Sequence, residues 1–314
     1  MDMKRVLVTC PPMLGMFDEF VEPAKSLGIE LVAAKTTQVL SEDELIVLLP
    51  EYDGWIIGDD PATRRVFEAG FNGQLKAAVK WGIGVDNVDF QACNDLGIPI
   101  TNTPNMFGGE VADVGMALLL GLARQTHFID REIKNNFAWP KPAGMSIAGK
   151  SVGVVGFGDI GESLVKRLGG FDVDITVYDP GVEGDKGYGY VTREDFPNGV
   201  ELLDFLIFTC SLNRHNYHML NADIIRKLKR GVMIVNVARG PLIDENALID
   251  ALQDGHIAAA GLDVFEVEPL PANSPLRDMP QCIFGSHNGS NTKEGVRRAT
   301  NQAILHIANY LKAQ

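Results

Sequence analysis

The chain has 314 residues, which is long enough for two domains that each bury a hydrophobic core. Its hydrophobic content of 46% and charged content of 22% are ordinary for a soluble globular protein. The formal net charge of −13 argues against nucleic acid as a main partner, because contacts to a phosphate backbone need a basic face.

The start of the chain and its cysteines bear on location. An apolar run from Arg5 to Val8 is cut short by Pro11 and Pro12, so it predicts a first strand and not a signal peptide. The most apolar helical stretch, residues 115–123, is far shorter than a membrane span. We therefore expect a cytoplasmic protein with no membrane partner. The four cysteines lack a C-x-x-C spacing and indicate reduced, mostly buried thiols: Cys10, Cys93, Cys210 and Cys282.

Residues 5–101 are predicted to alternate short strands with helices. One of the helices begins at a capping box formed by Ser41 and Glu44. Alternating strands and helices with short connections predict a parallel, doubly wound sheet. The predicted strands are residues 5–9, 30–33, 54–57, 75–79 and 98–101.

The distinctive stretch of this first segment is KWGIGVDNVD, which starts at Lys80 and follows a predicted strand. The backbone around Gly82, Ile83 and Gly84 could present N–H groups to an anion, with Lys80 beside them. A simple glycine turn before a helix explains the same residues equally well, and the sequence leaves both readings open.

A long helix is predicted over residues 109–134, after a break at Asn102 to Asn105. Apolar or small residues occupy nearly every face of this helix. A helix that is apolar all round is buried, so we expect it to pack against its own domain and against a second subunit in a homodimer.

A glycine fingerprint organises the second half of the chain. The apolar run SVGVV leads into GFGDIG, whose glycines are Gly156, Gly158 and Gly161. The first glycine suits a tight turn, the second lets a backbone approach a pyrophosphate, and the third lets the helix lie close to the strand. The N–H groups at the start of that helix, at Asp159 and Ile160, would face the phosphates.

A second apolar run ends at Asp179, eighteen residues after Gly161. A carboxylate at the tip of a second strand suits the two ribose hydroxyls of NAD and repels the 2′-phosphate of NADP. Together the strand, the turn, the helix and the acid predict an NAD-binding Rossmann domain.

Three more stretches follow predicted strands of this domain, where ligands bind in open α/β sheets. Arg239 ends an apolar strand, an unfavourable place for a guanidinium unless it meets an anion. The stretch GLDVFEVEP holds three carboxylates, and His287 lies among small polar residues. A carboxylate against an imidazole supports proton transfer near neutral pH, as a hydride-transfer enzyme needs. The alternatives are a structural ion pair for Arg239 and loop caps for Asp263 and Glu266.

The domain boundaries follow from the two breaks in the pattern. A C-terminal helix over residues 292–312 remains after a hinge-like stretch at residues 285–290. We expect it to return to the first domain. Residues 1–102 and 289–314 would then form the substrate domain, and residues 103–288 an inserted NAD-binding domain, with a cleft between the two.

The chain resembles the D-isomer-specific 2-hydroxyacid dehydrogenase family over essentially its full length. The motifs that carry the resemblance are GFGDIG with Asp179, NVARG, GLDVFEVEP, SHNGS, WGIGVDNVD and NTPNMFGGEVAD. The phosphoglycerate dehydrogenase-like group is the most similar, without its C-terminal regulatory domain. The resemblance implies an α/β fold of two doubly wound parallel-sheet domains, with the Rossmann cofactor domain inserted into a flavodoxin-like substrate domain.

The resemblance also implies residue roles. Arg239 would orient the substrate, Glu268 would support the base, and His287 would be the acid–base. Asp263 would contact the nicotinamide carboxamide. Lys80 and the backbone of Gly82, Ile83 and Gly84 would hold the substrate carboxylate, and no metal site is expected. The expected NAD contacts are Gly156, Gly158, Asp159, Ile160, Gly161, Asp179, Cys210, Val237, Ala238 and Asp263.

Three departures from the family pattern concern the substrate. Gly285-Ser286 stands where Thr-Pro usually precedes the histidine, Cys210 begins a segment that replaces Pro-Leu-Thr, and Lys80 replaces a common Arg. Lys80 and Arg239 together favour a small 2-hydroxy acid with a second anionic group, so 3-phosphoglycerate is the first choice. Asp59 and Asp60 would repel a phosphate if they point inward. The alternatives are a glyoxylate/hydroxypyruvate reductase and, in another class, an NAD(H)-sensing binding protein on the same fold.

Overall fold

The structure is a computed structural model that describes residues 3–36, 38–182 and 186–313. The chain divides into two compact units. The first unit comprises Met1–Met106 with Asn291–Gln314, and the second comprises Phe107–Ser290. The two junctions therefore follow residues 106 and 290, where the sequence placed them after residues 102 and 288.

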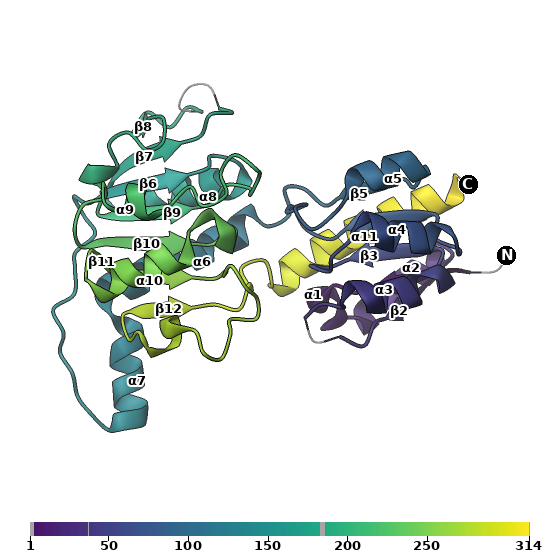
Figure 1. Ribbon diagram of the computed structural model, residues 1–314, viewed down its shortest axis with the longest axis horizontal. Helices are drawn as coiled ribbons and strands as arrows, with labels where there is room; N and C mark the ends of the chain where they lie inside the picture. The colour runs from purple at the N-terminus through teal and green to yellow at the C-terminus, as the bar shows by residue number, and fades with distance from the viewer. Residues whose placement is uncertain (1–2, 37, 183–185, 314) are drawn as a thin grey trace. The chain divides into compact units, whose positions relative to one another are not determined.

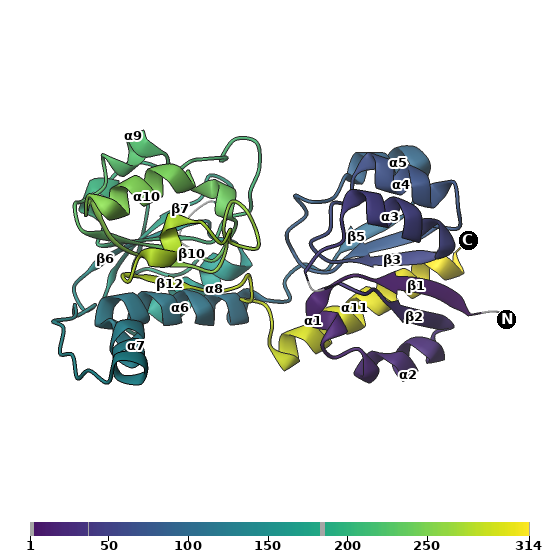
Figure 2. The ribbon, with the colours of Figure 1, turned by 60° about the horizontal axis from the view of Figure 1, so that its bottom comes forward.

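The first unit is built on a five-stranded parallel sheet in the order β2-β1-β3-β4-β5, which is the flavodoxin-like order. Helices α3, α4 and α5 cover one face, and α11 lies on the other with α1 and α2 (Figures 1 and 2). The strands are β1 Lys4–Val8, β2 Ile29–Ala33, β3 Gly54–Ile57, β4 Ala77–Lys80 and β5 Ile100–Asn102. The helices are α1 Pro11–Leu14, α2 Asp18–Ser26, α3 Glu42–Leu48, η1 Leu49–Glu51, α4 Arg64–Phe71, α5 Phe90–Leu96 and α11 Lys293–Lys312.

The last helix belongs to the first unit, where it packs against β3 and β4. Its N-cap Thr292 accepts a hydrogen bond from Gly295 N at 3.0 Å. Farther along, Thr300 Oγ1 accepts a hydrogen bond from Trp81 Nε1 at 3.0 Å, and both groups are buried. A buried indole N–H without an acceptor is costly, so this contact fixes the C-terminal helix beside β4.

The second unit contains a seven-stranded parallel sheet in the order β12-β11-β10-β9-β6-β7-β8. The chain order reverses between β6 and β9, and ligands of open α/β sheets bind at such a switch point. Its strands are β6 Ser151–Val155, β7 Asp174–Tyr178, β8 Val191–Arg193, β9 Phe205–Phe208, β10 Val232–Asn236, β11 Ile257–Leu262 and β12 Cys282–Phe284. Its helices are α6 Gly108–Arg124, α7 Thr126–Asn136, α8 Asp159–Leu168, η2 Val200–Leu202, α9 Ala222–Ile225, η3 Gly240–Leu242, α10 Glu245–Gln253 and η4 Pro275–Asp278.

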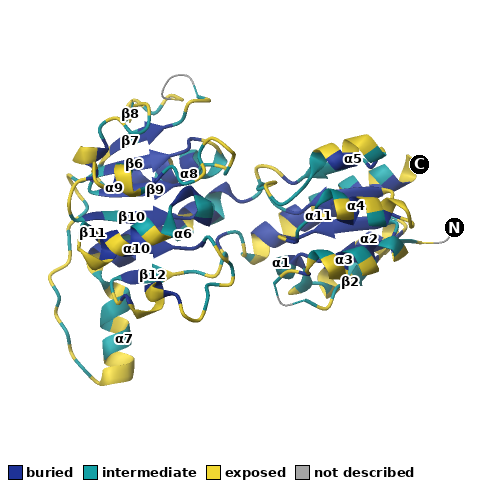
Figure 3. Ribbon diagram, in the orientation of Figure 1, coloured by how far each residue is buried: buried dark blue, intermediate teal, exposed yellow. Residues whose placement is uncertain are grey.

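The central strands of both sheets are buried on both faces (Figure 3). Strands such as FLIF in β9 and GWII in β3 are apolar throughout because helices cover both sides of a parallel sheet. The α/β class with two doubly wound parallel sheets, expected from the sequence, is confirmed. Among the described residues, no helix combines the length and the apolar character needed to cross a membrane.

The single long helix predicted over residues 109–134 is wrong. The helix stops at Gln125, which has a left-handed φ of 52°, and a second helix begins at Thr126. Helix α6 packs against α8, β10, β11 and β12 of its own unit, so its apolar faces are already covered. Helix α7 buries none of its residues and extends away from the sheet (Figure 1).

Candidate functional site

Two glycines of the fingerprint are required by close packing of the protein on itself. Gly156 follows β6 with a φ of +100°, and a Cβ there would lie 2.6 Å from Cys210 N. A Cβ on Gly161 would lie 2.0 Å from Gly156 O, so α8 can approach the turn only because residue 161 lacks a side chain. Thr209 Oγ1 donates to Gly156 O at 2.9 Å and holds this carbonyl in place.

The third glycine, Gly158, is different. A Cβ at this position would find nothing within 4 Å among the described residues, so the protein itself does not require a glycine. Gly158 is also the N-cap of α8, and no side chain caps this helix end. Asp159, Ile160 and Gly161 form the first turn, whose N–H groups and positive dipole end suit an anion. Open space beside an uncapped helix end fits a bound pyrophosphate.

Asp179 follows β7 directly, and its carboxylate is turned toward the glycine turn. Its Oδ2 accepts from Phe157 N at 2.6 Å, and its Oδ1 accepts from Gly181 N at 2.8 Å. This places a negative charge where the predicted ribose hydroxyls would lie.

Sequence reasoning missed a cation beside this turn. Lys186 Nζ donates to Phe157 O at 2.6 Å and pairs with Glu162 Oε2 at 2.8 Å. The Lys186 hydrogen bond holds the pKa of Glu162 below its usual value. The residues directly after Asp179 carry no such cation, and only the fold brings Lys186 back to the turn.

Cys210 packs its backbone under the turn at Gly156. Burial raises the pKa of its thiol to about 12, so the group is an uncharged wall of the site and not a nucleophile. Asn216 Nδ2 lies 3.8 Å from its sulfur.

The turn after β10 presents Arg239. Val237 and Ala238 are buried, and Ala238 N donates to Asn236 Oδ1 at 3.0 Å. The amide Nδ2 of Asn236 donates to Arg239 O at 2.8 Å. Asn236 therefore shapes the turn that carries the arginine, a role that the NVARG motif contains but that the sequence reading passed over. Arg239 Nη1 in turn donates to Ala238 O at 2.9 Å.

His287 and Glu268 form a close pair. His287 Nδ1 lies 2.7 Å from Glu268 Oε2, and the other carboxylate oxygen accepts from Phe265 N at 2.9 Å. Both side chains are about a quarter exposed, so the pair is reachable from solvent yet partly shielded from it. A carboxylate that is itself held by a backbone amide fixes the ring orientation of its histidine.

The sheet brings the other predicted groups to the same edge. Strands β10, β11 and β12 are parallel neighbours, and Arg239, Asp263 and His287 follow their carboxyl ends. Asp263 is only 3% exposed and accepts from the backbone N–H groups of Asn288 and Gly289. Burial raises its pKa, and those two amide hydrogen bonds oppose the rise.

Glu266 lies apart from this pair. It accepts from Glu245 N at 3.2 Å and lies 2.5 Å from His218 Nε2. Asp244, the N-cap of α10, is close enough that the three side chains offer ligand atoms within 4.8 Å of one another. Its bond from Glu245 N is a cap at the start of α10, which fits the loop-cap alternative that the sequence left open for Glu266.

In the first unit, Lys80 is 2% exposed at the end of β4. Its Nζ donates to Gly58 O at 2.5 Å and to Asp59 Oδ1 at 3.0 Å, so a carboxylate already faces this cation. The next loop contains the other predicted anion contacts. Gly82 has a φ of +119° and donates its N–H to Thr103 Oγ1 at 2.8 Å. Asn102 Nδ2 donates to Ile83 O at 3.2 Å, and Gly84 follows in the same loop.

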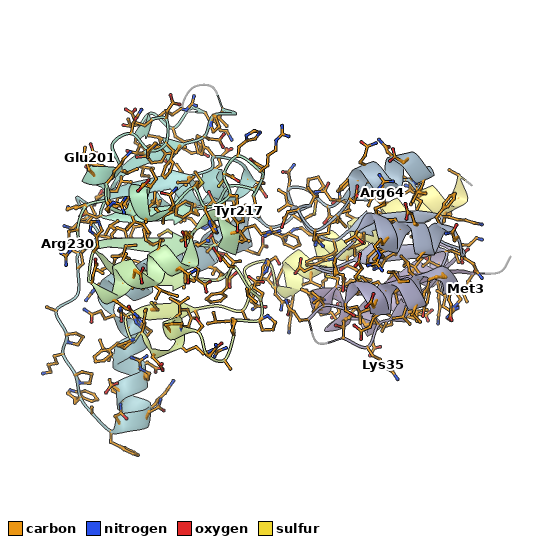
Figure 4. The ribbon with its side chains drawn as sticks, viewed as in Figure 1. Met3, Lys35, Arg64, Glu201, Tyr217 and Arg230 are labelled. Carbon is orange, nitrogen blue, oxygen red and sulfur yellow. The ribbon has the colours of Figure 1, made fainter. Side chains whose placement is uncertain are left out.

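Three other charged residues of this unit also have partners within it. Asp60 is fully buried and accepts from Leu40 N at 2.8 Å and Gly58 N at 3.1 Å. Arg64, labelled in Figure 4, pairs with Asp95 at 2.6 Å, and both side chains are partly exposed. Arg65 pairs with Glu42 at 2.7 Å.

The comparisons with known proteins agree with this geometry. Residues 116–289 match the NAD-binding domain of D-isomer-specific 2-hydroxyacid dehydrogenases. The chain is 37% identical over 279 residues to a hydroxypyruvate reductase of Thermotoga maritima, covering 87% of this chain and 89% of that protein. It is 34% identical over 310 residues to a glyoxylate reductase of Korarchaeum cryptofilum, covering 96% and 87%.

Two further matches extend this picture. A D-3-phosphoglycerate dehydrogenase of Methanocaldococcus jannaschii is 32% identical over 317 residues, covering 99% of this chain and 58% of that protein. Among solved structures, the TT0316 protein from Thermus thermophilus superimposes with a TM-score of 0.87 at 28% identity, covering 99% of this chain and 97% of that one.

Gly158 and Gly161 should respond differently to an added methyl group. Gly158→Ala should unfold at the same temperature as the wild type but bind NADH at least about tenfold more weakly, because the methyl enters space that the protein leaves open. Gly161→Ala should lower the free energy of unfolding by about 1–3 kcal/mol, because its methyl meets the Gly156 carbonyl. Thermal unfolding and NADH titration by protein fluorescence separate the two. Unchanged NADH affinity in Gly158→Ala would remove the case for a cofactor at this turn.

Proposed function

The chain belongs to the D-isomer-specific 2-hydroxyacid dehydrogenase family, and from that premise we propose that it reduces hydroxypyruvate or glyoxylate with NADH. The reaction class is that of an NAD-dependent dehydrogenase acting on a small 2-hydroxy or 2-keto acid. The observation that carries the proposal is the 2.7 Å pair of His287 and Glu268, at the sheet edge where β10 also presents Arg239.

The acid–base step is assigned to His287. When bound, NADH supplies the hydride that goes to the keto carbon. Glu268 engages Nδ1, so we assign Nε2 as the ring nitrogen that gives a proton to the carbonyl oxygen. Glu268 also stabilises the positive ring before the proton leaves. In the oxidation direction the same nitrogen takes the hydroxyl proton.

Orientation of the substrate is assigned to Arg239. A guanidinium can hold a carboxylate through two parallel hydrogen bonds and so fix the keto group that is attached to it. The turn that carries Arg239 is held by the side chain of Asn236 and by the hydrogen bond from Asp263 N to Asn236 O at 2.9 Å. This arrangement keeps the arginine and the histidine on connected pieces of backbone.

The charge of Lys80 bears on the choice of substrate. The first choice from the sequence, 3-phosphoglycerate, needed Lys80 and Arg239 as two available cations. Lys80 faces Asp59 at 3.0 Å, and both Arg64 and Arg65 face carboxylates of their own unit. A phosphate would have to compete with Asp59 for Lys80, whereas an uncharged hydroxymethyl group or a hydrogen would not. The matches to a hydroxypyruvate and a glyoxylate reductase support the same order of preference.

We also propose a homodimer, through the second unit. The apolar faces of α6 are covered within its own unit, so they do not support a dimer. The segment after α7 does support one. Phe137 is 94% exposed and Trp139 is 77% exposed, which is unusual for side chains of this size. A second copy that packs on this segment would bury both aromatic side chains.

Removal of the catalytic groups should give graded losses with hydroxypyruvate as substrate. His287→Ala should lower kcat by about 10²–10⁴, the usual effect of losing a general acid–base. Glu268→Gln should lower kcat less, because the amide still orients the ring. Arg239→Ala should raise KM and lower kcat together. His306→Ala, on α11 of the other unit, is the matched control. Near-normal turnover by His287→Ala would overturn the assignment.

The substrate preference can be measured directly. The wild type should show a kcat/KM at least about tenfold higher for hydroxypyruvate than for its phosphorylated form, a difference of about 1.4 kcal/mol, because the phosphate must compete with Asp59 for Lys80. Asp59→Asn should narrow that gap, because Lys80 then lacks its carboxylate partner. Lys80→Ala should lower kcat/KM for both. If the wild type prefers the phosphorylated substrate, the ranking is wrong and 3-phosphoglycerate returns as the substrate.

The dimer can be tested by sedimentation velocity at micromolar concentration. The wild type should sediment as a dimer, and the double variant Phe137→Ser/Trp139→Ser should shift toward monomer because it removes two large apolar contacts. Val47→Ser is the control, since Val47 is 74% exposed but lies on α3 of the first unit. A monomeric wild type would contradict the proposal.

A further inference from the structure

We propose that Asp263 positions the acid–base histidine, and that Gly285 is the partner that makes this possible. Asp263 would then act on the reaction through His287. The acid–base role of His287 in this proposal rests on the proposed function. The claim that Asp263 holds the backbone of the histidine turn does not depend on it.

Three consecutive backbone amides converge on Asp263. His287 N donates to the main-chain oxygen of Asp263 at 2.7 Å. Asn288 N donates to Oδ1 at 3.1 Å, and Gly289 N donates to Oδ2 at 2.9 Å. Successive amides that point into one concavity form an anion-binding nest, and here the carboxylate of Asp263 fills it. One residue therefore holds the whole turn that carries the histidine.

The histidine needs such support because its backbone is strained. His287 has a φ of 55°, in the left-handed region that is unfavourable for any residue with a Cβ. Such a conformation costs of order 1–3 kcal/mol and persists only when its surroundings enforce it. The amides of His287 and Asn288 lie on either side of the His287 Cα. Both donate to Asp263, and these two bonds help to enforce the left-handed conformation. With the backbone held, the imidazole can meet Glu268 at 2.7 Å.

Gly285 provides the room for this carboxylate. A Cβ on Gly285 would lie 2.0 Å from Asp263 Oδ1 and 2.9 Å from its Cγ. Gly285 does not have a positive φ, so conformational freedom is not the reason for a glycine here. The family pattern usually has Thr-Pro before the histidine, and a threonine at residue 285 would exclude the observed position of the carboxylate. The observed position of the Asp263 carboxylate therefore requires a glycine at residue 285, where the family pattern usually has a threonine.

Burial makes the arrangement cooperative. Asp263 is 3% exposed, and burial raises its pKa, while the amides of Asn288 and Gly289 and the nearby His287 favour the charged form. The turn stabilises the carboxylate through two amides, and the carboxylate in turn holds the amides of Asn288 and Gly289. Asp263 N also donates to Asn236 O, so the same residue connects the histidine turn to the arginine turn.

The experiment is a double-mutant cycle read by amide hydrogen exchange and by NADH binding. The variants are Asp263→Ala, Gly285→Ala and the double variant, with Gly170→Ala as the matched control. An added Cβ at Gly170 meets only Arg167 O, at 3.6 Å. Asp263→Asn keeps the size of the side chain but replaces one of its two acceptor oxygens. It takes the place of Asp263→Ala in the cycle if that variant does not fold. Exchange is followed by mass spectrometry on peptides that contain residues 285–290.

Each single variant should speed exchange of the amides of residues 287–289 by about tenfold or more, as expected when a local hydrogen-bonded unit opens. The double variant should be no faster than Asp263→Ala, because the added methyl then has no carboxylate to displace. NADH affinity should stay within about twofold while kcat falls at least about tenfold. Gly170→Ala should match the wild type throughout, and Asp263→Asn should be intermediate.

Two results would overturn the proposal. One is unchanged exchange at residues 287–289 with weakened NADH binding, which would assign Asp263 to the cofactor. The other is an equal effect of Gly285→Ala with and without the Asp263 carboxylate. Hydrogen exchange and NADH binding can be measured without turnover. A wild type that is inactive on every 2-keto acid would refute the proposed function, but these two measurements would still show whether Asp263 holds the loop.

Discussion

The 2.7 Å hydrogen bond between Glu268 and His287 depends on two loops that follow neighbouring strands and meet at one sheet edge. Side chains would keep the loops that follow β10, β11 and β12 apart at two points. A Cβ on Gly240 would lie 1.9 Å from the Phe265 carbonyl carbon, and one on Gly285 would lie 2.0 Å from the Asp263 carboxylate. The surroundings of the His287–Glu268 pair therefore include close approaches that only glycine permits, and the same constraint recurs where Gly161 meets Gly156.

Local patterns explain what could be predicted from the sequence. The capping box of Ser41 and Glu44 forms as expected, and Asp179 stands directly after its strand beside the glycine turn. These features depend on residues that are close in sequence or on the regular geometry of a strand, a turn and a helix. The prediction of Arg239, Asp263 and His287 as site residues rests on a similar regularity, since each follows a parallel strand and such ends share one edge.

What could not be predicted depends on side-chain directions and on contacts between distant segments. Apolar periodicity continues through Gln125, so nothing local announced the left-handed break between α6 and α7. The sequence predicts Lys80 as an available cation, but in the fold its ammonium group pairs with Asp59. Lys186 meets the carbonyl of Phe157, which lies 29 residues earlier in the sequence. These contacts set the surroundings of the candidate site, and a linear pattern does not contain them.

We propose that this family member performs chemistry on a small 2-keto acid and does not merely bind NAD(H). The most direct measurement is the initial rate of NADH oxidation, followed by the loss of nicotinamide absorbance, with hydroxypyruvate and glyoxylate. We expect NADH oxidation that requires one of these acids and yields, from hydroxypyruvate, the D-hydroxy acid. Tight NADH binding without oxidation by any 2-keto acid would contradict it and would favour an NAD(H)-sensing protein.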